Sequence, residues 1–197
     1  MEASGLDPKK HSMVSVGAIE FERPERQFYA EPRVWEGAQF DPDALQINGF
    51  SKDECLDESR RPFKDVMRDL YTWIEKAEER TLVAQNPSSD RDFVNAGLSR
   101  TGISWRFSYR TIDLHTVAIV DHIQRGITIP HENQRSALNL DAILKYVGLP
   151  EEPRPHNALT GAMSHAEALS RILYAKALLP EFSSYPIPPH LQTRLRE

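Results

Sequence analysis

Apolar residues recur every three to four positions along much of the chain, and this spacing predicts amphipathic helices. The most regular stretch, residues 62–79, places seven apolar side chains on one helical face: Phe63, Val66, Met67, Leu70, Trp73, Ile74 and Ala77. A short helix is predicted over 41–49, because Asp41 can cap its first turn and Gly49 follows its last. Further helices are predicted over residues 93–98, 114–124, 140–147 and 158–173.

Alternating and β-branched stretches predict the strands. Residues 13–21 and 26–35, joined by a short polar link, are typical of a β-hairpin, and shorter strands are predicted over 81–84 and 106–112. Strands come first and then alternate with helices, so the pattern favours an α/β fold with a mixed sheet and helices on both faces. The proline-rich and charged residues after 179 predict a C-terminal tail.

Composition narrows the class of protein. A chain of 197 residues with 40% apolar residues suits one domain with a sizeable core. The lone Cys55 excludes a disulfide framework and a cysteine-built zinc site within the chain, which predicts a reducing, cytoplasmic location. No apolar run approaches the length of a membrane span, so no membrane partner is expected. The net charge of −5 argues against coating of nucleic acid by counterion release alone, but not against a nucleic-acid enzyme.

The junction before the last long helix carries the main candidate for chemistry. Pro153 and Pro155 hold the chain extended just before His156, which places this histidine where a loop turns into the helix 158–173. An imidazole at the mouth of a buried helix is a candidate general base. The alternative from the residues alone is a loop histidine without chemistry.

Four stretches in order resemble the motifs of the DEDDh-type 3′–5′ exonucleases of the ribonuclease H-like superfamily. The run His156-Asn-Ala-Leu-Thr-Gly-Ala162 resembles the third motif of that family. The run Glu2-Ala-Ser-Gly-Leu6, followed by the strand 13–21, is similar to the opening motif. Residues 82–90 with Phe93 resemble the second motif, and Thr111-Ile-Asp-Leu114 is similar to a segment of many members.

The resemblance implies a fold, an activity and a set of site residues. It implies a ribonuclease H-like exonuclease domain over residues 1–179, followed by a tail over 180–197. It implies hydrolysis at the 3′ end of single-stranded DNA or RNA by a two-metal mechanism with Mg²⁺ or Mn²⁺. Oligomeric state stays open, a homodimer being one alternative. The residues carried over are Glu2 and Asp90 as metal ligands, His156 as general base, and Ala3, Ser4 and Leu6 as contacts of the terminal nucleotide.

Two positions depart from the family pattern. The family has an aspartate two places before the residue that matches Glu2, but this chain begins at Met1, so the first strand is expected to be missing or truncated. The Met1 amino group is then expected close to the metal position. Gly161 stands where the family has its last acid. His165 lies one turn further along the helix, either as a solvated histidine or as a ligand to a softer metal such as manganese.

Three hypotheses follow from the resemblance and its departures. The favoured one is a 3′–5′ exonuclease whose first strand is encoded upstream of Met1 and in which other groups compensate for Gly161. The second is a catalytically degenerate relative that binds single-stranded ends or a polymerase-like partner. The third is an adaptor that uses the fold only as a scaffold for protein interaction.

Overall fold

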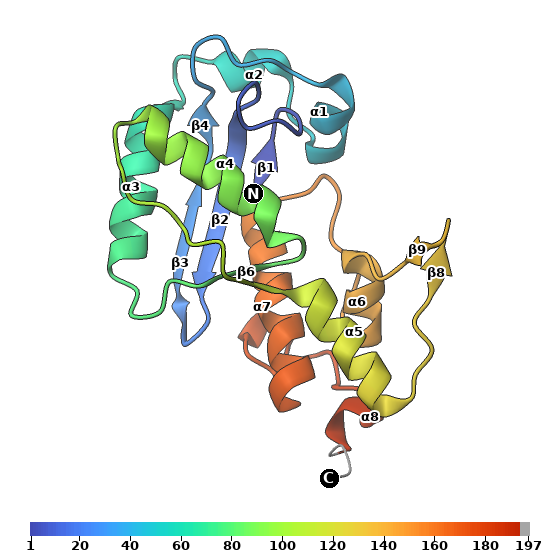
Figure 1. Ribbon diagram of the computed structural model, residues 1–197. Helices are drawn as coiled ribbons and strands as arrows, with labels where there is room; N and C mark the ends of the chain where they lie inside the picture. The colour runs from blue at the N-terminus through green and yellow to red at the C-terminus, as the bar shows by residue number, and fades with distance from the viewer. Residues whose placement is uncertain (194–197) are drawn as a thin grey trace.

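A hairpin of two long strands lies at the centre of the upper half of the molecule (Figure 1). The computed structural model describes residues 1–193, so the last four residues of the predicted tail, 194–197, lie outside the described part. Strand β2 (Met13–Glu20) pairs antiparallel with β3 (Arg23–Ala30), which confirms the predicted hairpin. The short strand β1 (Glu2–Ala3) pairs antiparallel with the first half of β2.

The other strands form short separate pairs rather than one continuous sheet. Parallel pairing joins β4 to β5 and β6 to β7, and antiparallel pairing joins β8 to β9. The strands therefore run in mixed directions, as predicted. Their bounds are β4 Pro32–Arg33, β5 Arg61–Pro62, β6 Leu82–Ala84, β7 Thr111–Asp113, β8 His131–Glu132 and β9 Arg135–Ser136.

The helices begin and end at recognisable caps. The Asp41 carboxylate accepts a hydrogen bond from the Asp43 backbone amide (3.0 Å), and Gly49 ends the first helix in the left-handed conformation, as predicted. The helices are α1 Pro42–Asn48, α2 Lys52–Leu56, α3 Phe63–Glu75, α4 Pro87–Arg100, α5 Leu114–Arg125, α6 Leu140–Tyr146, α7 Ala158–Tyr174, the 3₁₀ helix η1 Pro180–Phe182 and α8 Pro189–Gln192.

Apolar side chains gather in two cores. The first core packs the hairpin against α3 and α4, and α4 crosses in front of β1 and β2 in Figure 1. The second core joins α5, α6, α7 and α8 in the lower half. Buried members of the first core are Met13, Val16, Ala30, Phe63, Val66, Met67, Leu70, Ile74, Phe93, Val94 and Leu98. Those of the second are Leu114, Ala118, Leu138, Ile143, Leu144, Val147, Leu149, Ala168, Leu169, Ile172 and Leu191.

The predicted strand over 106–112 is wrong except at its end, where β7 begins at Thr111. The Asn95 side chain satisfies the backbone of Phe107 in place of a strand partner: its Oδ1 accepts from the Phe107 amide (2.8 Å) and its Nδ2 donates to the Phe107 carbonyl (3.3 Å). Trp105 packs edge-on against the Phe107 ring, with 4.8 Å between centroids. Alternation here therefore reflects aromatic packing on the first core.

The described part of the predicted tail packs onto the body of the protein. Leu191 in α8 is buried in the second core, and Phe182 and Ile187 pack against it. The Arg171 guanidinium of α7 donates to the carbonyls of Phe182 (3.2 Å) and Tyr185 (2.9 Å). The domain boundary at residue 179 stays a prediction.

Helix α7 lies directly on strand β2 at Gly17. A Cβ atom placed on Gly17 would come within 2.3 Å of the Ala158 carbonyl carbon and oxygen and of the Leu159 nitrogen. These are backbone atoms of the first turn of α7, so they cannot move aside as a flexible side chain would. Glycine at this position therefore allows the start of α7 to rest on the sheet.

Replacing Gly17 with alanine is expected to lower the free energy of unfolding by about 1–3 kcal/mol, because the new methyl group overpacks against backbone. Gly97→Ala is the matched control. There the nearest atoms are the flexible end of Met67, at 3.0 Å, and alanine also favours helix α4. We expect Gly97→Ala to stay within about 1 kcal/mol. Urea unfolding checks both, and equal effects of the two substitutions would contradict the close contact at Gly17.

Candidate active site

The start of α7 holds His156 at the junction that the sequence predicted. Asn157 caps the helix, its side-chain oxygen accepting from the backbone amides of Leu159 (2.9 Å) and Thr160 (3.2 Å). His156 directly precedes this cap, and its side chain is 25% exposed. No residue in the described chain is hydrogen-bonded to its ring. The cap therefore holds the backbone next to His156, whose ring is partly open to solvent.

Asp90 lies in the first turn of α4, where the helix dipole favours a negative charge. The Met1 α-amino group donates to Asp90 Oδ1 at 3.1 Å, so it lies beside one of the two predicted metal ligands. Burial alone would lower the pKa of this amino group, but the charges of Asp90 and Glu2 outweigh burial and raise it. The surroundings of Asp90 are thus strongly electronegative.

Glu2, on β1, lies near Asp90 and the Met1 amino group. Burial raises the pKa of its carboxyl, the negative charges of Glu152 and Asp90 raise it further, and the Met1 amino group and His156 oppose this. These mutual effects require proximity, so the structure brings together the predicted site residues Glu2, Asp90 and His156. We call these three residues and Glu152 the acidic cluster. Their roles stay predictions at this point.

Glu152 is the member of the acidic cluster that sequence reasoning missed. Its Oε2 lies 4.0 Å from His156 Nδ1, and its side chain is only 10% exposed. Burial raises the pKa of this carboxyl and Asp141 adds to the effect, while His156 and the Met1 amino group lower it. The available signal was its position four residues before His156 in a short loop.

His165, one turn beyond Gly161 on α7, is not the solvated histidine that the sequence favoured. Its Nε2 is buried and lacks a hydrogen-bond partner in the described chain. Burial lowers the pKa of this imidazole, which the nearby Asp90 partly opposes. An orphaned ring nitrogen therefore lies beside the acidic cluster.

The three predicted nucleotide contacts are placed differently from one another. Ser4 is fully buried, its hydroxyl donating to the Gln39 carbonyl (2.7 Å) and accepting from the Ser12 amide (3.0 Å). Leu6 is 86% exposed and free to contact a ligand. Ala3 is half-buried, its carbonyl accepting from Asn48. Ser4 thus holds the turn after β1, and only Leu6 is open to solvent among the three.

The acidic cluster fits a divalent cation in its chemistry. Its three carboxylates come from β1, from α4 and from the loop before α7, and oxygen donors suit Mg²⁺ and Mn²⁺. Within residues 1–193 no three His, Cys, Asp or Glu side chains stand close enough together to enclose an ion as they are arranged. These residues therefore match a divalent cation in the type of donor atom, and the Met1 amino group lies beside one of them, Asp90.

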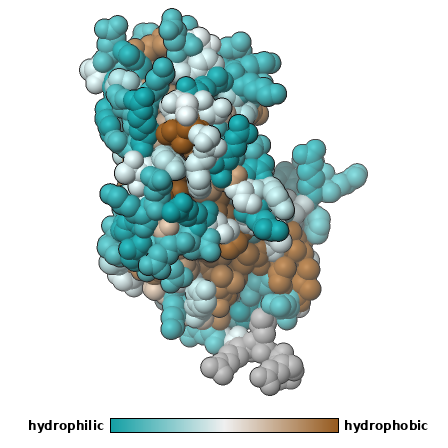
Figure 2. Space-filling model, turned by 60° about the vertical axis from the view of Figure 1, so that its left-hand side comes forward, coloured by the Kyte–Doolittle hydropathy of each residue, from teal (hydrophilic) through white to brown (hydrophobic). Residues whose placement is uncertain are grey.

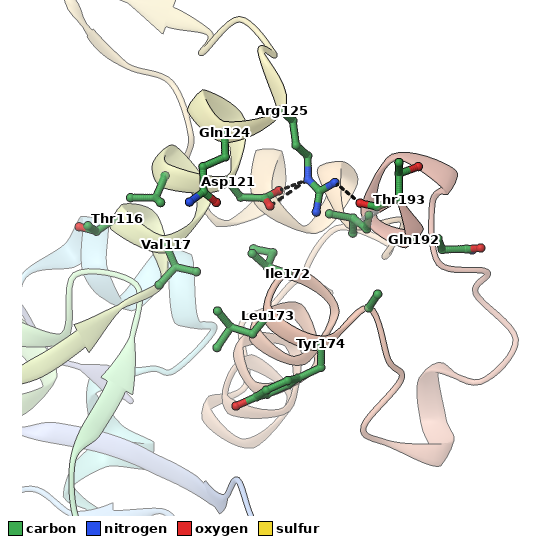
Figure 3. A pocket seen from close by; sticks show the side chains of 13 residues that line it. Thr116, Val117, Asp121, Gln124, Arg125, Ile172, Leu173, Tyr174, Gln192 and Thr193 are labelled. Atoms are coloured by element: carbon green, nitrogen blue, oxygen red, sulfur yellow. Dashed lines mark hydrogen bonds and ion pairs between the residues drawn. The ribbon is translucent and has the colours of Figure 1, made fainter. Parts of the chain in front are cut away.

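A groove at the other end of α7 is separate from the acidic cluster. It has a volume of about 680 Å³ and lies between α5, the end of α7 and α8 (Figure 3). Asp121 and Arg125, which both line it, are paired with each other at 2.9 Å. Figure 2 shows apolar surface in the lower half of the molecule. Exposed apolar side chains of α5 and α7 include Ile123 and Leu173. The groove presents apolar surface and no free catalytic group.

None of the helices in residues 1–193 combines the length and the apolar character needed to cross a bilayer.

Comparisons with solved structures define the fold. The nuclease domain of 3′hExo, a DEDDh family member bound to rAMP, superposes with a TM-score of 0.66 at 16% identity, over 90% of each chain. Escherichia coli Exonuclease I in complex with a 5cy-dT13 oligonucleotide gives a TM-score of 0.66 at 16% identity, over 88% of this chain and 40% of that one. The chain therefore has the ribonuclease H-like fold of the DEDDh exonucleases, as predicted.

Comparisons with known sequences find relatives over about half of the chain. No family model matches the chain. Ribonuclease T of Haemophilus influenzae strain PittEE is 27% identical over 118 residues, which are 52% of this chain and 50% of the relative. Ribonuclease T of strain 86-028NP is 24% identical over 116 residues. The chain spans about half the length of these relatives, and it is similar in sequence to ribonuclease T over that part.

Proposed function

We propose that this protein is a 3′–5′ exonuclease that hydrolyses single-stranded DNA or RNA with the help of Mg²⁺ or Mn²⁺. One observation carries the proposal: Glu2, Asp90 and His156, far apart in the sequence, meet at the start of α7. Neighbours of the same fold were solved with single-stranded oligonucleotides or with rAMP, and one with zinc, which supports a single-stranded substrate and a divalent cation.

The residues have complementary roles in this reaction. Glu2 and Asp90 would hold the cations through their carboxylate oxygens. A bound divalent cation would supply charge neutralisation at the scissile phosphate and a lower pKa for the attacking water. His156 accepts the proton of the attacking water, and the rigid cap at Asn157 fixes its position. Leu6, exposed beyond β1, packs against the terminal base.

Replacing Asp90 with asparagine is expected to slow digestion by about 100-fold, because loss of a ligand removes about 3 kcal/mol of transition-state stabilisation. The assay compares a 3′-labelled with a 5′-labelled single strand, in Mg²⁺, in Mn²⁺ and with a chelator. We expect early release of the 3′ label, a ladder shortening from the 3′ end of the 5′-labelled strand, and no reaction with the chelator.

Asp92→Asn is the matched control, because Asp92 lies two residues further on α4, is 52% exposed and pairs with Arg91. We expect it to keep the wild-type rate within about twofold, since exposed ion pairs contribute little. Cutting of a circular single strand, or equal losses for both substitutions, would contradict the proposal. Binding of single strands without any digestion would instead favour the degenerate binding module.

A further inference from the structure

The space beside Gly161 is filled by a carboxylate from another part of the chain. A Cβ atom placed on Gly161 would lie 2.7 Å from Glu152 Oε1 and 3.7 Å from Glu152 Cδ. Gly161 is buried in the first turns of α7 and faces the acidic cluster through this contact. The Glu152 carboxylate therefore occupies the place into which a side chain at position 161 would point.

Glu152 is buried without the hydrogen bonds that a buried carboxylate requires. Its side chain is nine-tenths buried, yet no donor in the described chain forms a hydrogen bond with its carboxylate oxygens. Glu152 Oε2 lies 4.0 Å from His156 Nδ1, and the Glu152 backbone amide donates to Asp141 Oδ1 at 3.2 Å. A largely buried carboxylate that receives no hydrogen bond has oxygen atoms available for a cation.

A second orphaned group lies one turn along the same helix. His165 Nε2 is buried and has no hydrogen-bond partner among residues 1–193. Residues 161 and 165 share one face of α7, because positions four apart align on a helix. The Glu152 carboxylate and His165 Nε2, neither of which has a hydrogen-bond partner among residues 1–193, thus lie on either side of position 161.

We propose that Glu152 is a metal ligand of the active site and supplies, from the loop before α7, the carboxylate that Gly161 cannot supply. This inference rests on the proposed function, because it assigns one more ligand to the same cation site. Glu152 joins Glu2 and Asp90, so that three carboxylates serve the cation. The absence of a side chain at position 161 is then a requirement of the site, since any larger residue would displace Glu152.

Calorimetric titration of the 197-residue chain with Mn²⁺ alone tests the assignment without relying on catalysis. Glu152→Gln is expected to weaken Mn²⁺ binding by about tenfold or more. Glu151→Gln is the matched control, because Glu151 is the exposed neighbour in the same loop, and it should change the affinity less than about twofold. Thermal unfolding verifies that each variant is folded.

A carboxylate exchange separates ligation from a merely structural role. Glu152→Ala alone should lose Mn²⁺ affinity, and adding Gly161→Asp should recover most of it, because the acid returns to the helix and the space beside it is now empty. Wild-type Mn²⁺ affinity in Glu152→Gln, or no recovery in the double variant, overturns the assignment. So does a wild-type chain that binds no Mn²⁺ at millimolar concentration.

The same titration keeps the two proposals distinguishable. Digestion by the wild-type chain, together with unchanged Mn²⁺ affinity in Glu152→Gln, contradicts this inference and leaves the proposed function standing. Mn²⁺ binding that depends on Glu152, without digestion of any single strand, contradicts the proposed function and supports the ligand assignment.

Discussion

Replacing Arg171 with methionine is expected to lower the free energy of unfolding by about 3–5 kcal/mol, because it leaves Glu167 as a buried charge without its partner. Both side chains are fully buried, and Arg171 Nε donates to Glu167 Oε1 at 2.7 Å. The other Glu167 oxygen accepts from the Leu178 and Leu179 amides at 2.8 and 2.9 Å. One side-chain pair thus joins α7 to the segment that follows it.

Guanidinium unfolding of the full chain measures this effect, with Arg68→Met as the control. Arg68 pairs with Asp65 on the exposed face of α3, at 3.2 Å, with both side chains about half-exposed. Such a pair contributes less than about 1 kcal/mol. A loss below about 1 kcal/mol for Arg171→Met would show that the segment after α7 does not depend on this pair.

Replacing His156 with alanine is expected to lower kcat by about 10²–10⁴-fold, the usual contribution of a general base. The Km for a short single strand should change little, because the imidazole acts on the attacking water and the carboxylates hold the cation. Mn²⁺ affinity should likewise stay near that of the wild type. Single-turnover digestion of a 3′-labelled strand, with a parallel Mn²⁺ titration, measures both quantities.

His131→Ala is the control for this substitution. His131 lies in the exposed strand β8, where its ring nitrogen contacts the Ile129 carbonyl at 2.8 Å. We expect digestion by this variant to match the wild type. If His156→Ala digests as fast as His131→Ala, another group accepts the proton and the assignment of His156 is wrong.

Local signals in the sequence were sufficient for the hairpin, the long helices and the junction at His156. Asp41, Asn139 and Gly126 mark helix ends by side-chain caps or left-handed backbone, which depend on few neighbours. The strand predicted over 106–112 failed because Asn95, far from it in sequence, satisfies the Phe107 backbone. The alternation of apolar and polar residues carries no information about such a contact between residues distant in the sequence.

Glu152 could not be found from the motif because the motif places an acid on the helix itself. The substitution of position 161 by glycine is visible in the sequence, but the group that fills the resulting space comes from a loop whose path depends on the tertiary fold. A similar limit explains Ser4, which matches a nucleotide-contacting position but bonds to Gln39 and Ser12. The spacing of residues in the sequence predicts which of them share a helix face. The direction of a side chain in a loop depends on the tertiary structure and cannot be predicted in this way.

The two cores come from successive parts of the chain, so the first core can fold before the second during translation. Every buried member of the first core precedes residue 99, and every buried member of the second follows residue 113. Because translation proceeds at about 5–20 residues per second, the hairpin with α3 and α4 can fold before α7 has been synthesised. The face of β2 that receives α7 at Gly17 then stays uncovered for several seconds. That interval is when the nascent chain is most exposed to aggregation, and it ends when α7 docks.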